Sequence, residues 1–189
     1  MIDHINISPA KIEDASFIAW AVSAAINDEE ILSHYCGFDF RHVLTKIAEC
    51  PTSQYGYPNA LIAKTNDGKR VGAIIGYDGA QLATLRKSTF SIIHKHTNQT
   101  PSLPDETQPG EFYIDSLAVV PEYQGQGIAT SLIQALCLKA QKQGHDIVGL
   151  IAEERNEKAL KLYQTIGFKM VGITIFFTHP MKHLQKMLT

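Results

Sequence analysis

An apolar, strand-like run, a short loop with two glycines and a helical run follow one another between Phe112 and Lys142. The loop holds Gly125 and Gly127, and the helix begins directly after it. The first backbone N–H groups of a helix have no intrahelical acceptor, and the positive end of the helix dipole lies at the same place. Taken alone, the glycines are also compatible with an ordinary strand-to-helix turn. The arrangement is typical of phosphate-binding sites, so we predict that a phosphorylated ligand binds at 124–130.

Strands and helices are mixed along the whole chain, which predicts an α/β (α+β) fold around one central sheet. We predict a strand at 2–7, a helix that starts at Ser8-Pro9 and ends at the acidic run from Asp28, and a helix at 39–49. The Asp67-Gly68 pair predicts a hairpin between strands at 60–64 and 70–77. The pattern then indicates a helix at 79–96, a long proline-containing loop at 97–110, strands at 112–120, 146–152 and 168–178, and helices at 126–143 and 157–166.

Composition excludes several functional classes. With 44% hydrophobic and 19% charged residues and a net charge of −2, the chain is expected to fold but not to hold nucleic acid through charge alone. No apolar stretch approaches the roughly 20 residues that span a bilayer, and the first residues do not read as a signal peptide, so we expect a cytoplasmic protein. Three widely spaced cysteines indicate neither a disulfide framework nor a metal site.

Two segments together carry a family resemblance. The first is Leu117-Ala118-Val119 followed by Gln124-Gly125-Gln126-Gly127-Ile128-Ala129, and the second is Asn156 to Tyr163 with Gly167-Phe168 after it. In this order they resemble the GNAT superfamily of acyl-CoA-dependent N-acetyltransferases. The resemblance implies one GNAT-like domain over 1–189, with a mixed, twisted sheet flanked by helices. It also implies a V-shaped opening between the fourth and fifth strands.

The resemblance assigns the loop to acetyl-CoA. Gln124 and the amides of Gly125, Gln126, Gly127, Ile128, Ala129 and Thr130 are expected to bind the pyrophosphate, and the backbone of Leu117, Ala118 and Val119 the pantetheine arm. Asn156 matches a cofactor-contacting asparagine, although N-capping of its helix would also explain it. Tyr163 matches the general acid that protonates the leaving thiolate, although it shares a helical face with Leu160 and Ile166 and could simply pack.

The general base is less defined by the sequence. Strand alternation places Glu111, Tyr113, Asp115, Leu117 and Val119 on one face. The glutamate that family members commonly carry on this strand is replaced here by Tyr113. Asp115 is therefore the first candidate and Glu111, expected to be more solvated, the second. Either would act directly, act through water, or only bind a cationic substrate.

The predicted reaction is acetyl transfer from acetyl-CoA to a primary amine in a ternary complex, without a metal. A small-molecule amine is the preferred acceptor, and an acceptor cleft closed by the 80–109 insertion would favour it. An open groove would instead favour a protein N-terminus or lysine. A non-catalytic acyl-CoA-binding module is the third hypothesis. The apolar last strand with Phe176 and Phe177 is compatible with a homodimer.

Overall fold

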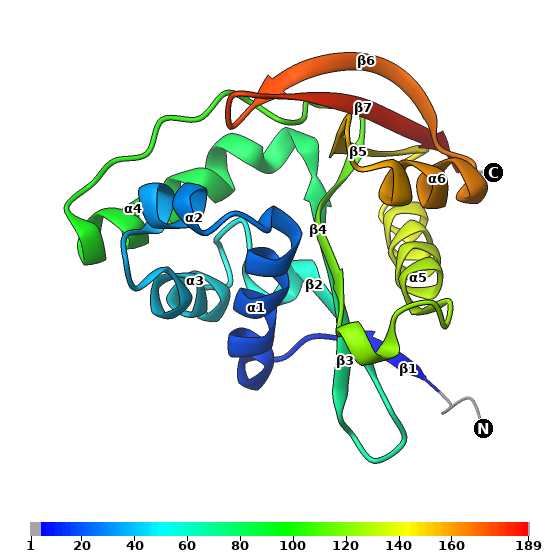
Figure 1. The fold of residues 1–189 in the computed structure, drawn as a ribbon, viewed down its shortest axis with the longest axis horizontal. Helices are drawn as coiled ribbons and strands as arrows, with labels where there is room; N and C mark the ends of the chain where they lie inside the picture. Colours follow the sequence, from blue (N-terminus) through cyan, green and yellow to red (C-terminus); the bar gives the residue numbers. More distant parts are fainter. Residues whose placement is uncertain (1–4, 189) are drawn as a thin grey trace.

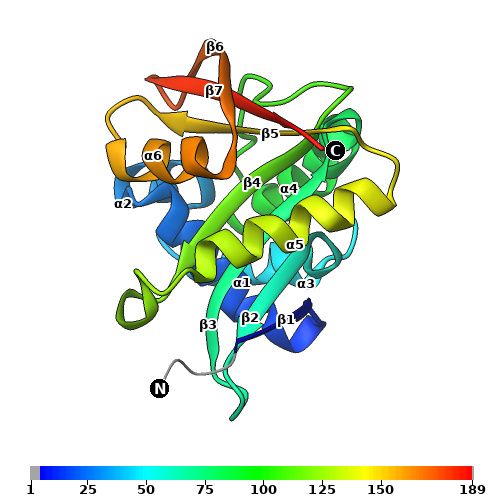
Figure 2. The ribbon, with the colours of Figure 1, turned by 90° about the vertical axis from the view of Figure 1, so that its right-hand side faces the viewer.

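A computed structural model describes residues 5–188 and contains one seven-stranded sheet within that range. The strand order is β1-β2-β3-β4-β5-β7-β6, and only β4 and β5 run parallel among the neighbouring pairs. The mixed α/β fold that the sequence predicts is confirmed, and Figure 2 shows how strongly the sheet twists between β2 and β7. The strands are β1 (Asn6–Pro9), β2 (Ala60–Lys64), β3 (Arg70–Asp78), β4 (Phe112–Val119), β5 (Ile147–Glu153), β6 (Lys169–Phe176) and β7 (His179–Met187).

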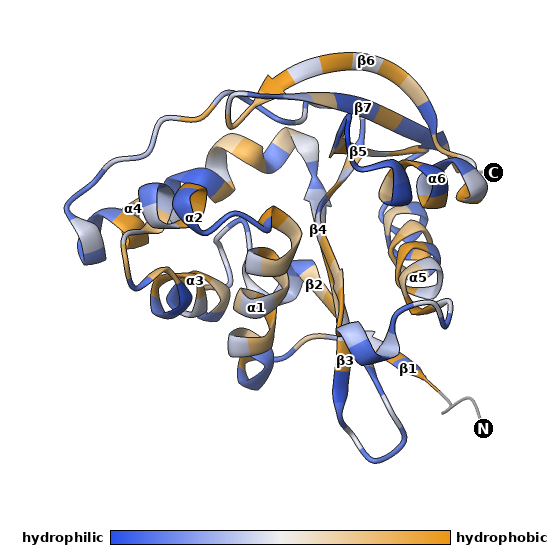
Figure 3. Cartoon of the chain, viewed as in Figure 1, coloured by the Kyte–Doolittle hydropathy of each residue, from blue (hydrophilic) through white to orange (hydrophobic). Residues whose placement is uncertain are grey.

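Helices cover both faces of the sheet (Figure 1). On one face lie α1 (Ala15–Ile26), α2 (Glu29–Cys36), α3 (Phe40–Glu49) and α4 (Leu82–Thr97), and on the other α5 (Ile128–Lys142) and α6 (Glu157–Ile166). Alternate residues of the strands feed the two cores: Ile75 packs with α1 and α3, whereas its neighbour Ile74 packs with α5. Figure 3 shows hydrophobic residues along the central strands and on the helix sides that face them. No helix in the described part of the chain is both long and apolar enough to span a bilayer.

The N-terminal third differs from the sequence prediction. The first strand is Asn6–Pro9, so Ser8 and Pro9 belong to β1 and do not start a helix; residues 2–4 of the predicted strand lie outside the described range. Asp28 was expected to end the first helix, but it begins α2 instead. Its Oδ1 accepts hydrogen bonds from the backbone N–H groups of Glu30 and Ile31, each at 3.0 Å. An aspartate is a strong N-cap, so the acidic run opens a helix that the sequence prediction missed.

The C-terminal strand is one arm of a hairpin. The sequence predicts a single strand at 168–178, but β6 ends at Phe176 and the chain returns as β7, which lies between β5 and β6. The reversal uses Phe177 and Thr178, with φ of 46° and 65°. Such a turn usually carries Gly, Asn or Asp, so no residue of this turn signals a hairpin. The other predicted elements are confirmed, with boundaries that shift by at most three residues.

The β6 strand lies at the edge of the sheet. Its exposed apolar side chains are Met170, Val171, Ile173 and Ile175. Phe176 and Phe177, which the sequence prediction connects with a homodimer, lie at the end of β6 and in the turn after it: Phe176 is buried and the Phe177 ring lies 6.0 Å from that of Tyr35 in α2.

The central parallel pair separates soon after it forms. The β4 and β5 strands are paired only from Phe112 to Ile114 and from Val148 to Leu150. Beyond this point β4 keeps β3 as a neighbour and β5 keeps β7. The V-shaped opening expected between the fourth and fifth strands is therefore present, and the β5-facing edge of β4 is free of strand pairing from Asp115 to Val119.

A β-bulge lies where the two strands separate. Ser116 is opposite Ile75 and Ile114 is opposite Gly76, so Asp115 is an extra residue without an opposite partner. Because of the bulge, the prediction that Asp115 shares one face of the strand with Leu117 and Val119 is wrong. Leu117 and Val119 pack in the α5-side core together with Ile114, whereas the Asp115 carboxylate turns to the other face and contacts Tyr77.

Candidate active site

Two adjoining cavities occupy the opening between β4 and β5. They share Leu117, Asn156, Ala159 and Tyr163 as lining residues. The loop cavity, of about 410 Å³, lies between the end of β4, the glycine loop and α6. The acidic cavity, of about 510 Å³, lies between the C-terminal end of α1, the β4 bulge, β5 and the β6–β7 turn. A ligand that fills both would pass Tyr163 at the junction.

The loop cavity contains the predicted phosphate cradle. Gly125 and Gly127 have φ of 75° and 81°, a region in which residues with a Cβ are strained, and a Cβ built on either would meet no atom within 4 Å. The amides of the first turn of α5 begin at this point. Of the predicted cofactor residues, Gln126 alone does not line the cavity; its side chain donates to the Glu122 carbonyl at 3.3 Å. Those that do are Leu117, Ala118, Val119, Gln124, Gly125, Gly127, Ile128, Ala129, Thr130 and Asn156.

Gln124 joins the loop to both walls of the loop cavity. Its Nε2 donates to the Val119 carbonyl at 3.1 Å, and its Oε1 accepts from Lys158 Nζ at 3.3 Å. Lys158, two residues into α6, thus places a positive charge beside the cradle. The sequence prediction missed it because a lysine in an exposed first turn carries no motif.

Asn156 and Tyr163 lie at the junction of the two cavities. Asn156 Oδ1 accepts from the Ala159 backbone N–H at 3.1 Å, so it caps α6 while it also lines both cavities. Tyr163 packs edge-on against Phe168, with 5.9 Å between ring centroids, and also faces both cavities. Burial raises the pKa of Tyr163 to about 12, so its phenol carries a proton at neutral pH.

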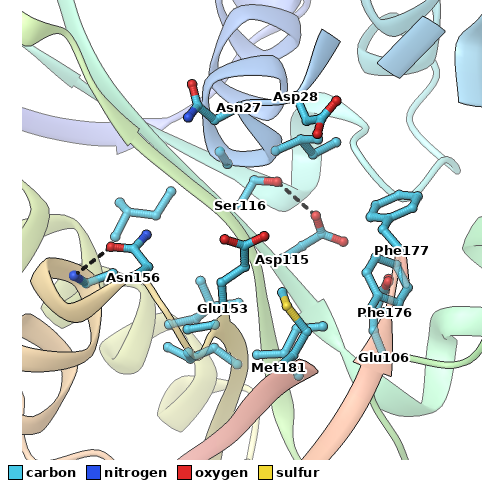
Figure 4. Close-up of a pocket in the computed structure, with 18 of the residues that line it drawn as sticks. Asn27, Asp28, Glu106, Asp115, Ser116, Glu153, Asn156, Phe176, Phe177 and Met181 are labelled. Atoms are coloured by element: carbon cyan, nitrogen blue, oxygen red, sulfur yellow. Dashed lines mark hydrogen bonds between the residues drawn. The ribbon is translucent and has the colours of Figure 1, made fainter. Parts of the chain in front are cut away.

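Carboxylates dominate the acidic cavity (Figure 4). The four that line it come from α2's cap, the long loop, β4 and β5: Asp28, Glu106, Asp115 and Glu153. The lining also includes Arg155, but its guanidinium donates hydrogen bonds of 2.9 and 3.2 Å to the Glu153 carboxylate. The lining also includes apolar side chains, namely Phe176, Phe177 and Met181 (Figure 4).

Asp115 is held by three donors. Its carboxylate accepts from Tyr77 Oη at 2.7 Å, from Gln54 Nε2 at 2.9 Å and from the Ser116 hydroxyl at 2.9 Å. Even so, burial raises the pKa of Asp115. Its neighbour Glu106, from the long loop, has its pKa raised to about 8, first by burial and then by the charge of Asp115. Sequence reasoning missed Glu106, Gln54 and Tyr77, because no local pattern connects residues so far apart in the chain.

Glu111 does not reach either cavity. Its side chain is buried rather than solvated, and it accepts from Thr107 Oγ1 at 2.6 Å and from Gln185 Nε2 at 2.8 Å. His183 Nε2 lies 2.9 Å from the same carboxylate. Burial alone would raise the pKa of Glu111, but these partners outweigh it and lower that pKa. The structure therefore brings Asp115 and Tyr163 to one opening. It places the Glu111 carboxylate away from both cavities, against Gly149 of β5 and Gln185 of β7.

A mixed sheet whose parallel central strands separate beside a glycine loop and a helix N-terminus defines the class of acyl-CoA-dependent transferases. Comparison agrees: the sequence model of the acetyltransferase (GNAT) family matches residues 24–168, and the chain belongs to this family.

Relatives with solved structures share the whole fold. A crystal structure of an N-acetyltransferase from Staphylococcus aureus Mu50 is 28% identical, with a TM-score of 0.81 over 96% of this chain and 100% of that one. Sequence relatives match over shorter stretches. The mycothiol acetyltransferase of Propionibacterium freudenreichii is 26% identical over 109 residues, which span 57% of this chain and 34% of the relative. N-alpha-acetyltransferase 30 of Schizosaccharomyces pombe is 45% identical over 56 residues, 30% of this chain and 37% of the relative. The chain thus aligns with about a third of the length of these two proteins.

Proposed function

We propose that this protein transfers the acetyl group of acetyl-CoA to the primary amine of a small, positively charged molecule. The observation that carries the proposal is the junction of the loop cavity and the acidic cavity at Tyr163. Acetyl-CoA supplies a thioester at this junction. The amine nitrogen forms a bond to the acetyl carbon as the carbon–sulfur bond breaks. Asp115 takes one proton of the ammonium before this attack. The departing sulfur takes the proton of Tyr163, and the second proton that the nitrogen loses returns to the Tyr163 phenolate through solvent.

The residues of the loop cavity fit coenzyme A. Its pyrophosphate matches the amides at the start of α5, and the open space beside Gly125 and Gly127 leaves room for it. Lys158 adds a cation for a phosphate oxygen. Leu117 to Val119 have no strand partner on the β5 side, so their backbone groups can pair with the amides of the pantetheine arm.

The acid and base assignments rest on position and protonation. A general base works best when its pKa lies near the operating pH, and burial shifts the pKa of Asp115 in that direction. Tyr163 keeps its proton at neutral pH because its pKa is raised to about 12. Asp115 therefore serves as acceptor and Tyr163 as donor on the two sides of the reacting thioester.

The shape and charge of the acidic cavity favour a small cationic acceptor. The β6–β7 turn bears Phe177, which packs against Tyr35 of α2 and closes that side of the cavity, while the long loop contributes Glu106 to its base. Four carboxylates line the cavity, and the arginine among them is already paired. An amine that carries positive charge gains from this lining, because opposite charges attract more strongly at a partly desolvated site.

The test is a thiol-release assay with acetyl-CoA and an amine panel. The panel contains diamines and polyamines, amino sugars, neutral amines, and peptides with free N-termini or lysines. We expect turnover with small cationic amines. Turnover of peptides alone would move the assignment to a protein N-acetyltransferase, and binding of coenzyme A without thiol release on any amine would leave a non-catalytic binding module.

A pair of tyrosine variants tests the acid. Tyr163→Phe should lower kcat and leave the KM for acetyl-CoA nearly unchanged. Tyr57→Phe is the matched control, because Tyr57 packs against the α1-side core and lines neither cavity. Equal turnover by Tyr163→Phe and the parent protein would remove Tyr163 as the acid.

A further inference from the structure

Two carboxyl groups that are distant in the sequence share the same two hydrogen-bond partners. Gln54 Nε2 lies 2.6 Å from Glu106 Oε1 and 2.9 Å from Asp115 Oδ2. The Tyr77 hydroxyl lies 3.3 Å and 2.7 Å from the same two oxygens. One amide nitrogen and one hydroxyl therefore bridge the carboxyl group of the long loop to that of the β4 bulge.

Three donor protons serve five close contacts at this bridge, so at most three of these contacts are hydrogen bonds at one time. The Gln54 amide has two N–H protons but three oxygens within 3.0 Å, and the Tyr77 hydroxyl can donate to only one of its two neighbours. Gln54 Oε1, on the other side of the amide, is buried without a partner. A proton bound between Glu106 and Asp115 stabilises the cluster, because a buried and a half-buried like charge that share the same hydrogen-bond donors repel each other.

The cation at this cluster offsets one negative charge. Arg86 Nη2 lies 3.1 Å from Glu106 Oε2, and both side chains are at most 7% exposed. The same guanidinium also pairs with the exposed Asp105 at 3.0 Å and donates to two loop carbonyls. Arg86 thus fixes the loop and neutralises Glu106 in part, while the pair as a whole keeps an excess negative charge.

We infer that Glu106 and Asp115 hold one proton between them, and that Glu106 thereby strengthens Asp115 as the base of the proposed acetyl transfer, on which this inference rests. The bridge makes Glu106 a positioning residue that acts through Asp115. Below about pH 8 the pair keeps its last proton, in line with the pKa of Glu106, which burial and the Asp115 charge raise to that value. Above it, the ionised pair takes the ammonium proton onto Asp115 more avidly than an isolated carboxylate would.

The facing tyrosines and the facing cysteine keep their protons in this range. Burial raises the pKa of each facing tyrosine well above neutrality, and that of the facing cysteine to about 12. Across the cavity, the Glu153 carboxylate has its pKa lowered by Arg155 and stays ionised. The facing groups are Tyr35 and Cys36 from α2, Tyr55 from the loop after α3, Tyr77 from β3, Arg86 from α4, Asp105 from the long loop and Tyr113 from β4, with Asp28, Glu153, Arg155 and His179 on the far side.

The pH profile of kcat/KM tests the inference. In Glu106→Gln the amide keeps the shape of the side chain but removes its negative charge. The rising limb of the kcat/KM profile should therefore move at least one pH unit lower. The plateau of the profile should fall, because Asp115 becomes a weaker base. Tyr77→Phe removes a donor to the Asp115 carboxylate and should move the limb to higher pH. Asp105→Asn is the control, because its exposed carboxylate also pairs with Arg86, and its limb should coincide with that of the parent. A Glu106→Gln profile that superposes on the parent profile overturns the inference.

A titration without substrate separates this inference from the proposed function. Carboxyl ¹³C resonances of protein labelled at Asp and Glu should include one that titrates near pH 8 and disappears in Glu106→Gln. If every carboxyl group titrates below about pH 6, the shared proton is refuted even in an active enzyme. If a carboxyl group titrates near pH 8 but no amine is acetylated, the shared proton is supported and the proposed function is refuted. Should Glu106→Gln not fold, the parent titration and the Tyr77→Phe profile decide.

Discussion

Replacement of Glu106 by glutamine should change how the stability of the protein depends on pH. An unfolded glutamate titrates near its ordinary pKa of about 4.3, whereas the folded pKa of Glu106 is about 8. Between these values the folded protein binds a proton that the unfolded chain has released, so stability is highest below the unfolded pKa and falls as pH rises to about 8. The slope is about 1.4 kcal/mol per pH unit for one proton. From pH 5.5 to 7.5, the parent should therefore lose about 2.7 kcal/mol that Glu106→Gln retains.

Urea unfolding at pH 5.5, 6.5 and 7.5 measures this difference, with Asp105→Asn as the exposed control at the same arginine. Comparison with the parent cancels the contributions of groups that do not interact with Glu106. Glu111 and Glu153, whose pKa values are lowered, lose their stabilisation only as pH falls below the ordinary glutamate range, outside this window. Parallel curves for the parent and Glu106→Gln between pH 5.5 and 7.5 would refute the buried, proton-holding glutamate.

Three further substitutions have outcomes that follow from the contacts described. Tyr163→Phe should lower kcat by roughly 10²-fold, the usual size of a general-acid effect, and steady-state kinetics with Tyr57→Phe as reference would show whether it does. Lys158→Ala should weaken coenzyme A binding several-fold and flatten its salt dependence by calorimetry; identical titrations at low salt would speak against a phosphate contact. Gly149→Ala should destabilise the protein by about 2–4 kcal/mol, because its Cβ would collide with the Glu111 carboxylate, and addition of Glu111→Ala should recover part of that loss. An unchanged melting temperature for Gly149→Ala would exclude that collision.

The sequence predicted the parts of the site that are local in the chain. The glycine loop, the start of α5 and the Asn156 cap each depend on residues within a few positions, and backbone chemistry alone indicates them. The β2–β3 hairpin was predictable for the same reason, since Asp67-Gly68 supplies its turn.

The parts of the site that depend on tertiary contacts were not predictable. Gln54, Tyr77 and Glu106 come from three separate segments and meet at Asp115 only after the sheet and the long loop have packed. Alternation along β4 was a sound expectation for a regular strand, but a bulge has no sequence signature of its own here, so Leu117 was assigned to the wrong face. The prediction missed the β6–β7 hairpin for a different reason. Its turn residues, Phe177 and Thr178, are not of the types that usually form such a turn.

The extra residue in β4 makes the length of this strand matter more than its composition. The residue between Ile114 and Ser116 is Asp115, and its removal would restore regular alternation with Ile114, Leu117 and Val119 still on the α5 side. The opening between β4 and β5 would lose the Asp115 carboxylate, while the apolar layer beneath α5 would keep its side chains. Substitutions at Ser116 or Ala118 keep the path of the chain and can be accommodated by small adjustments. We therefore expect homologous sequences to vary in the residues of this segment but to align across it without insertions or deletions.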